Sequence, residues 1–278
     1  GDRQTQAWCQ DVVLGKEKQE RLLLVWLQGG GGNFLNCRDL SQHLGQDQPF
    51  YGLQAVVIDG VHEPLATIEE MAAHYIEAIL PVQSAGPFFL GGYSGGGLIA
   101  FEMAQQLNAL GKEVELIVFF DTFHPGLDMK KRELNKHLSE FKTRGLSYLA
   151  ERANRKLARN YGQLSEKIKL KYYESKKGTV PYELRNSQMI YNIWNASSQY
   201  EPKPYAGKVL LFCAQITAEI YEHAGSERGW GETVANLEVV QIPGNHDNLL
   251  LVPNVDIIVE KLRAVLAVGS TAQRRHHA

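Results

Sequence analysis

Residues 88–104 read FFLGGYSGGGLIAFEMA and place one serine, Ser94, among five glycines. The apolar residues at 88–90 predict a short buried strand, and apolar residues at helical spacing from Leu98 onward predict a helix. A strand that turns directly into a helix forces the residue at the bend into a strained conformation, where side chains on its neighbours would clash. The G-x-S-x-G match at 92–96 therefore predicts a turn that presents Ser94 as a nucleophile. A glycine-rich turn that only lets a helix pack close to a strand would give a similar pattern.

Strand-like apolar runs alternate with helical patterns along much of the chain. Strands are expected at 22–27, 53–58, 87–91, 114–120, 208–213 and 237–242, and helices at 67–80, 97–110 and 253–268. Thr67 and Glu70 have the spacing of a capping box at the start of the first of these helices. Each strand is a nearly continuous apolar run, which is typical of a parallel sheet covered on both faces. The sequence therefore predicts an α/β fold with a mostly parallel central sheet and helices on both faces.

Residues 123–205 interrupt this alternation. Apolar residues recur at helical spacing between 134 and 157, which predicts an inserted helical lid. From 129 to 178 the chain holds 15 Lys and Arg against five Glu and no Asp, a surplus of +10 that leaves −12 on the remainder. This surplus fits either solvated helix faces or a basic lid that attracts an acidic partner or a phosphate. The expected division of the chain is an α/β core at 21–122 and 206–268, the lid at 123–205, and flexible termini at 1–20 and 269–278.

Two further residues complete a hydrolase arrangement with Ser94. Asp121 and His246 each follow the end of an expected strand. In a parallel α/β sheet, functional groups gather beyond the C-terminal ends of the strands, and the chain order Ser, Asp, His is that of the α/β-hydrolases. Taken singly, Asp121 fits a turn or helix cap and His246 fits a loop histidine bonded to the backbone. Glu219, which follows a later strand, is the alternative acid.

The expected roles follow from the chemistry of acyl transfer. A serine hydroxyl is a poor nucleophile at neutral pH, so His246 would take its proton, and Asp121 would hold the imidazole in the correct tautomer. The charge that develops on the carbonyl oxygen needs preorganised donors. The N–H of Gly95 is one candidate, and Gly30, in the glycine run at 29–32, is the best candidate for the second. That run could instead bind phosphate, but no Gly-Lys-Ser/Thr sequence follows it.

Composition limits the class of protein. The 278 residues are 44% hydrophobic and 22% charged, with a net charge of −2, as in ordinary soluble globular proteins. A chain of this length can form one large domain, or one domain with an insertion. No apolar run approaches the length of a membrane span, and the first twenty residues lack a signal pattern. The three scattered cysteines have no zinc-ligand spacing, so we expect a reducing, cytoplasmic setting and no metal.

Three segments together resemble a known family. They are GGYSGGGLIAFEMAQQLNALGKEVELIVFFDTFHP at 91–125, IPGNHDNLL at 242–250 and PFYGLQAVVIDG at 49–60. They are similar to the thioesterase domains that release products from polyketide synthases and nonribosomal peptide synthetases, and the resemblance covers about 20–125 and 205–266. The family often has an HPAGG-like loop after its first strand, whereas this chain has WLQGGGG at that place. This difference falls in the loop that contains Gly30, the expected second oxyanion donor.

The resemblance implies an α/β-hydrolase fold and a chemical role. An acyl, polyketide or peptidyl chain would arrive as a thioester on the phosphopantetheine arm of a carrier domain. Ser94 would accept it, and hydrolysis or macrocyclisation would release it, without a cofactor other than that arm. We expect a carrier domain as the partner, neither nucleic acid nor membrane, and leave open whether the chain forms a homodimer.

Three other functions compete with this one. A stand-alone editing thioesterase usually reads G-H-S-M-G at the turn and has a shorter lid, so Tyr93 and the long insertion argue against it. A general carboxylesterase would use the same three residues. A catalytically silent binding module on the same fold usually lacks the serine or the histidine, whereas Ser94 and His246 are both present.

Overall fold

The computed structural model describes residues 24–27, 35–45, 48–53, 65–127, 145, 147, 169, 172, 182–217, 221 and 224–276. Six strands form one parallel sheet in the order β2-β1-β3-β4-β5-β6. They are β1 (Leu24–Leu27), β2 (Phe50–Leu53), β3 (Phe88–Tyr93), β4 (Val114–Phe120), β5 (Tyr205–Ile216) and β6 (Val234–Asn245). The predicted parallel sheet is therefore confirmed.

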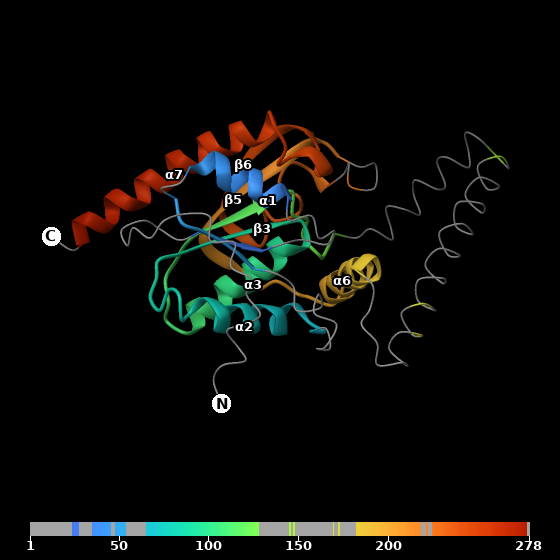
Figure 1. Cartoon of the computed structure of the whole chain (residues 1–278), viewed down its shortest axis with the longest axis horizontal. Helices are drawn as coiled ribbons and strands as arrows, with labels where there is room; N and C mark the ends of the chain where they lie inside the picture. The colour runs from blue at the N-terminus through green and yellow to red at the C-terminus, as the bar shows by residue number, and fades with distance from the viewer. Residues whose placement is uncertain are drawn as a thin grey trace.

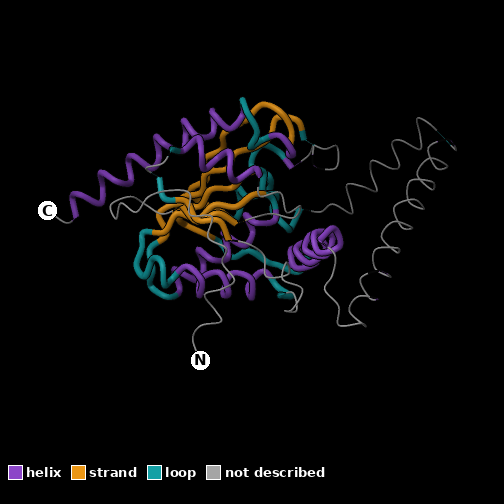
Figure 2. The backbone as a smooth tube through the Cα atoms, in the orientation of Figure 1, coloured by secondary structure: helices purple, strands orange, loops and turns teal. Residues whose placement is uncertain are grey.

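Five α-helices cover the sheet in the described part of the chain (Figure 1). They are α1 (Leu35–Leu44), α2 (Ile68–Ile79), α3 (Gly95–Ala109), α6 (Tyr182–Ser197) and α7 (Asn254–His276). Buried side chains of α2, α3 and α6 share one hydrophobic core with the sheet, and those of α1 and α7 share another. Figure 2 shows the same three layers, with the strands between the two sets of helices. The result is the α/β-hydrolase arrangement that the resemblance implied.

The apolar runs of the strands are continuous because both faces of the sheet are covered. Successive side chains of a strand point to opposite faces, so a strand with two cores needs an apolar residue at nearly every position. In β4, Ile117 and Phe119 join the core beneath α2 and α3, whereas Leu116, Val118 and Phe120 join the core beneath α1 and α7. Each of these side chains is at most 4% exposed.

Several elements differ from those predicted: β5 and β6 each extend three residues beyond both expected ends, and β2, α1 and α7 also depart. Strand β2 begins at Phe50 and its described part ends at Leu53, so it starts earlier than the expected 53–58, whose other residues lie outside the described ones. Helix α1 was not predicted. Its inner face is marked by the buried Leu40 and Leu44, and its end by Gly45, whose φ is 95°. Helix α7 continues to His276, into the tail that we expected to be flexible. This tail contains no proline, and its Ala, Gln and Arg residues favour helix.

The capping box at the start of α2 is confirmed. The N–H of Glu70 donates to Thr67 Oγ1 over 3.1 Å, and the Glu70 carboxylate accepts from the Thr67 N–H over 3.3 Å. These contacts satisfy two backbone donors that the first turn of a helix leaves free. They begin the helix at the residue that the sequence indicates.

The inserted segment contributes α6 to the described structure. Its buried stripe packs into the core beneath α2 and α3, and consists of Met189, Ile193 and Ala196, with Tyr200 just after the helix. The Tyr200 hydroxyl donates to Glu102 on α3 over 2.8 Å. The helical pattern predicted between 134 and 157 lies almost wholly outside the described residues, so the division into core, lid and termini stays a prediction.

No helix within the described ranges combines the length and the apolar character that a bilayer span requires.

Candidate functional site

Ser94 occupies the bend between β3 and α3. Its φ of 54° and ψ of −124° lie in a region that residues with a side chain rarely adopt. Its N–H donates to the carbonyl oxygen of Phe120 over 2.9 Å, which ties the bend to β4. Its hydroxyl makes no capping bond to α3. The strained turn therefore presents the serine side chain instead of using it to begin the helix.

Two glycines allow the bend to pass close to its neighbours. A Cβ at Gly92 would overlap the carbonyl group of Gly96, and a Cβ at Gly97 would overlap the side chain of Thr122. The Thr122 hydroxyl donates to the carbonyl oxygen of Ser94 over 3.0 Å. The turn is thus held against the residue that follows Asp121, which brings the ends of β3 and β4 together.

We expect Gly92→Ala to lower the free energy of unfolding by about 3 kcal/mol, because the added methyl group meets backbone atoms that cannot rotate away. The nearest are the Gly96 carbonyl group and the Gly97 nitrogen, which would lie 2.5 Å from the new Cβ. Urea denaturation followed by circular dichroism measures the loss. Gly111→Ala is the matched control: its Cβ meets no atom within 4 Å, and its φ of 70° alone should cost about 1 kcal/mol. Equal losses in the two variants would contradict the steric argument.

Asp121 lies at the end of β4 and is only 1% exposed. Its N–H donates to the carbonyl oxygen of Phe212 over 2.8 Å, and its φ of 48° turns the chain out of the strand. One carboxylate oxygen, Oδ2, lies 2.8 Å from Nδ1 of His246. The other, Oδ1, accepts the N–H of Ala214 over 3.2 Å. The carboxylate is therefore buried, bonded and aimed at the imidazole.

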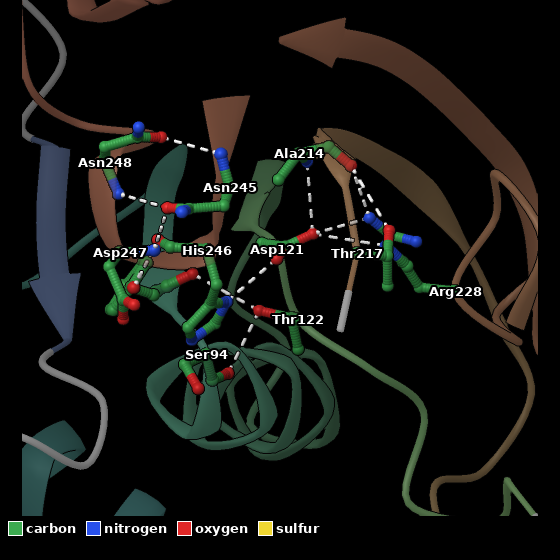
Figure 3. A network of polar contacts seen from close by, with 12 residues as sticks. Ser94, Asp121, Thr122, Ala214, Thr217, Arg228, Asn245, His246, Asp247 and Asn248 are labelled. Carbon is green, nitrogen blue, oxygen red and sulfur yellow. Dashed lines mark hydrogen bonds and ion pairs between the residues drawn. The ribbon is translucent and has the colours of Figure 1, made fainter. Parts of the chain in front are cut away.

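His246 follows β6 and begins a short 3₁₀ turn, His246–Asn248 (η4). The Asn245 side chain accepts the N–H groups of Asp247 and Asn248, each over 3.1 Å, and so holds this turn. Because a carboxylate can only accept, Nδ1 of His246 carries the proton that bonds Asp121. The other ring nitrogen, Nε2, is then free to accept, and it points toward Ser94 (Figure 3). The histidine side chain is 38% exposed, so it remains accessible to a substrate.

Tyr93, directly before Ser94, positions the histidine. Its ring stacks on that of His246 with centroids 4.8 Å apart, and its hydroxyl donates to the His246 carbonyl oxygen over 2.6 Å. Burial raises the pKa of Tyr93, and the nearby charges of Asp247 and Asp121 raise it further, so the phenol stays protonated and remains a donor. The sequence marked Tyr93 only as a member of the motif. Its contact spans 153 positions, and no local pattern reveals it.

Arg228 is a second residue that sequence reasoning missed. It lies in the turn between β5 and β6, and its side chain is 5% exposed. Its Nε donates to Asp121 Oδ1 over 3.1 Å, and its Nη2 forms an ion pair with the same oxygen at 3.0 Å. A buried arginine cannot be told from a surface arginine in a polar stretch such as GSERGWGE at 225–232, so the sequence carries no signal for it.

The structure brings together some of the predicted site residues and leaves others outside its description. Gly95 begins α3, so its N–H has no partner within the helix. A Cβ at this position would overlap the Cγ2 atom of Ile193 on α6. Gly30 and Glu219 lie outside the described residues, so the second oxyanion donor and the alternative acid stay untested. Asp247 is next to His246 in the chain but is exposed.

His124 serves the loop after β4. Its Nδ1 accepts the N–H of Gly126 over 3.0 Å, so the neutral ring carries its proton on Nε2, which lies 3.0 Å from Thr233 Oγ1. Its ring packs edge-on against Trp230 at 4.9 Å. These contacts join the loop that leads into the insertion to the turn before β6.

We expect His124 to make the protein less stable as the pH falls. Burial lowers the pKa of His124 from 6.5, although the charge of Glu232 opposes this. The unfolded chain therefore takes up this proton at a higher pH than the folded chain does, and stability falls as pH drops through about 6.5. Urea denaturation at about pH 7.5 and about pH 5.5 should show a larger loss for wild type than for His124→Gln. The difference should stay below about 1 kcal/mol, because solvent screens a half-buried ring. Equal losses would contradict the expectation.

Comparison with known proteins places this chain among thioesterase domains. A model of the thioesterase domain family matches residues 23–266. Chondramide synthase from Chondromyces crocatus is 28% identical over 268 residues, which cover 91% of this chain and 7% of the synthase. Indigoidine synthase from Dickeya dadantii is 43% identical over 104 residues, which cover 37% of this chain and 7% of that protein. The matched residues thus cover less than a tenth of the length of each of these curated relatives.

Solved structures share the fold. The NocB thioesterase domain, in covalent complex with a fluorophosphonate nocardicin G analog, superposes with a TM-score of 0.63 at 22% identity, covering 88% of this chain and 94% of that one. A four-domain nonribosomal peptide synthetase, holo-AB3403 bound to AMP and glycine, gives a TM-score of 0.64 at 24% identity and covers 92% of this chain and 20% of that one.

Proposed function

The chain belongs to the thioesterase domain family, and we propose from this premise that it releases an acyl, polyketide or peptidyl chain from a phosphopantetheinyl carrier domain. The family makes it a hydrolase. The observation that carries the finer proposal is the 2.8 Å bond between Asp121 and His246, beside a serine held at a strained strand–helix bend. Ser94, His246 and Asp121 are the proposed nucleophile, base and acid.

The first half of the proposed reaction forms an ester on Ser94. The hydroxyl oxygen attacks the thioester carbonyl carbon while Nε2 of His246 takes its proton. The resulting imidazolium is stabilised by Asp121 through the bond to Nδ1. When the tetrahedral intermediate collapses, the carbon–sulfur bond breaks, and His246 returns the proton to the leaving thiol of the phosphopantetheine arm. The reaction needs no cofactor other than that arm.

The second half releases the product. Water, or a hydroxyl or amine of the bound chain itself, attacks the ester carbonyl carbon while His246 takes its proton. The ester bond to Ser94 then breaks, and its oxygen recovers the proton from His246. In both halves the negative carbonyl oxygen would accept the N–H of Gly95 and that of Gly30. An attacking water gives an acid, and an internal nucleophile gives a macrocycle.

The proposed partner is a carrier domain. The surplus of +10 at 129–178 would favour association with an acidic domain and with the phosphate of its arm. The similarity to part of much longer synthases supports the same partner. Attraction of this kind weakens with salt, because exposed charges are screened over about 8 Å at physiological ionic strength.

Intact-mass spectrometry of the protein mixed with an acyl-pantetheine thioester tests the proposal. We expect a transient species heavier by the acyl group, which peptide mapping places on Ser94. The matched control is the corresponding simple ester. Reaction with the ester but with no thioester would replace the proposal by a carboxylesterase. Absence of an adduct with either, together with no labelling by a fluorophosphonate, would favour a silent binding module.

A further inference from the structure

We propose that Arg228 is a positioning residue for catalysis, which holds the Asp121 carboxylate in the orientation that presents Oδ2 to His246. The inference rests on the proposed function, because it assigns a role toward the proposed acid. Arg228 touches neither Ser94 nor His246 in the contacts recorded for the described chain (Figure 3). Any effect on the reaction must therefore pass through Asp121.

The first support is a closed ring of contacts between three residues. Arg228 donates from Nε to Asp121 Oδ1, and its Nη2 forms an ion pair with the same oxygen. The same Nη2 donates to the carbonyl oxygen of Ala214 over 2.7 Å. The N–H of Ala214 completes the ring by donating to the same Oδ1 over 3.2 Å. Two hydrogen bonds and one ion pair thus converge on Oδ1. Rotation of the carboxylate would break these contacts, so Oδ2 stays toward the imidazole.

The second support is charge. The side chains of Asp121 and Arg228 are 2% and 5% exposed, so neither charge is solvated by bulk water. A buried carboxylate is tolerated when a partner compensates its charge and satisfies its oxygens. Arginine is always protonated and offers a planar fork that fits a carboxylate. Arg228 contacts Oδ1, which does not face His246, so it compensates the charge of the carboxylate and leaves Oδ2 to accept from the imidazole.

The third support is backbone strain. Among the described residues, the non-glycine residues with positive φ are Ser94 at 54°, Asp121 at 48° and Arg228 at 50°. Such conformations persist where the surroundings over-determine them, and they cluster at functional sites. Two of the three are the proposed nucleophile and acid. The third is the residue bonded to that acid, which places Arg228 with the site and not with the general framework.

The fourth support is how firmly the arginine itself is held. Its carbonyl oxygen accepts the N–H of His124 over 2.9 Å, and the indole of Trp230 donates to the carbonyl oxygen of Thr122 over 3.0 Å. The guanidinium carbon lies 4.8 Å from the centre of the Phe123 ring, a cation–π distance. The turn that carries Arg228 is therefore bonded to residues 122–124, which directly follow Asp121.

A double-mutant cycle tests the proposal. The variants are Arg228→Met, Asp121→Asn and their combination, with Arg228→Lys as the conservative change and Arg263→Met as the matched control. Arg263 is an exposed arginine that also donates to a backbone carbonyl oxygen, that of His43 over 2.7 Å, and it lies on α7. Fluorophosphonate titration gives the concentration of reactive serine, and a p-nitrophenyl ester and an acyl-pantetheine thioester give kcat and KM.

We expect Arg228→Met to lower kcat by about 10- to 100-fold, the usual effect of losing an outer partner that orients a functional side chain. KM should change by less than about twofold, since binding is untouched. In the Asp121→Asn background the same change should lower kcat by less than about twofold, because without the carboxylate His246 no longer acts as the base whose orientation Arg228 supports. Arg228→Lys keeps the charge but loses the fork, so its kcat should fall between those of wild type and Arg228→Met.

A merely structural ion pair would give a different pattern. Equal factors in both backgrounds, or an unchanged kcat in Arg228→Met, would overturn the proposal. Where Arg228→Met does not fold, Arg228→Lys carries the test: the downfield proton resonance of His246 Nδ1–H should shift or broaden, and an unchanged resonance with wild-type kcat would overturn it. Arg263→Met should match wild type in both measurements.

The outcome is separable from that of the proposed function. Wild-type protein that hydrolyses the p-nitrophenyl ester but no thioester would remove the thioesterase proposal, while the cycle on the ester would still decide the role of Arg228. Absence of turnover on both substrates would overturn both.

Discussion

Ser94→Ala should lower turnover of an acyl-pantetheine thioester by about a millionfold, the loss typical when a serine hydrolase loses its nucleophile. No other hydroxyl is presented by the strained bend, so the covalent route closes. The fold should survive, because the hydroxyl makes no capping bond to α3 and alanine has the same backbone preferences as serine at this φ. The measurement is release of free thiol over time, with intact mass to detect an acyl adduct.

A serine elsewhere separates the chemical effect from the general effect of losing a hydroxyl. Ser198 is exposed at the end of α6, and its hydroxyl donates to the carbonyl oxygen of Asn195 over 2.8 Å. Ser198→Ala should keep wild-type turnover. We expect both variants to unfold within about 0.5 kcal/mol of wild type. Persistence of an acyl adduct in Ser94→Ala would show that another residue is the nucleophile.

Asp121→Asn should lower kcat by about four orders of magnitude, and the geometry gives the reason. The Nε–H of Arg228 and the N–H of Ala214 donate to Oδ1, and Nη2 of Arg228 pairs with it, so the oxygen of the new amide must take that place. Its NH₂ group then faces Nδ1 of His246. Since NH₂ only donates, Nδ1 must accept, and the proton moves to Nε2. The histidine can no longer take the proton of Ser94.

The same substitution leaves the Arg228 charge without its partner. We therefore expect the free energy of unfolding to fall by about 3 kcal/mol. Asp247→Asn is the matched control, because Asp247 adjoins His246 but is exposed, and its kcat should be unchanged. Steady-state kinetics and urea denaturation on the same preparations separate the two effects. Normal kcat in Asp121→Asn, with a large loss in Glu219→Gln, would make Glu219 the acid.

Much of the fold could be predicted because its signals are local. The continuous apolar run of 114–120 indicates a strand with two covered faces, and both faces are buried. Thr67 and Glu70 mark the start of α2 at the right residue. Boundaries were less certain where tertiary packing decides them: α1 is a short helix held by two buried leucines, and α7 runs past the expected end.

The sequence by itself determined which residues are available for the chemistry and roughly where they lie. A glycine-lined bend can present Ser94 because the backbone conformation is set by neighbours in the chain. Asp121 and His246 could be found because each follows a strand, and the ends of parallel strands meet at one edge. Their bond over 125 positions also depends on the strand order, in which β5 lies between β4 and β6.

Only the tertiary structure decided how these groups are held. Arg228 reaches Asp121 across 107 positions and Tyr93 reaches His246 across 153, and neither contact leaves a periodic or local pattern. The N–H of Ala214 in β5, a residue with no polar side chain, donates to the buried carboxylate. The burial, charge compensation and orientation of these side chains depend on which surfaces meet when the helices and loops pack around the sheet. They are properties of the packed chain and not of any one segment.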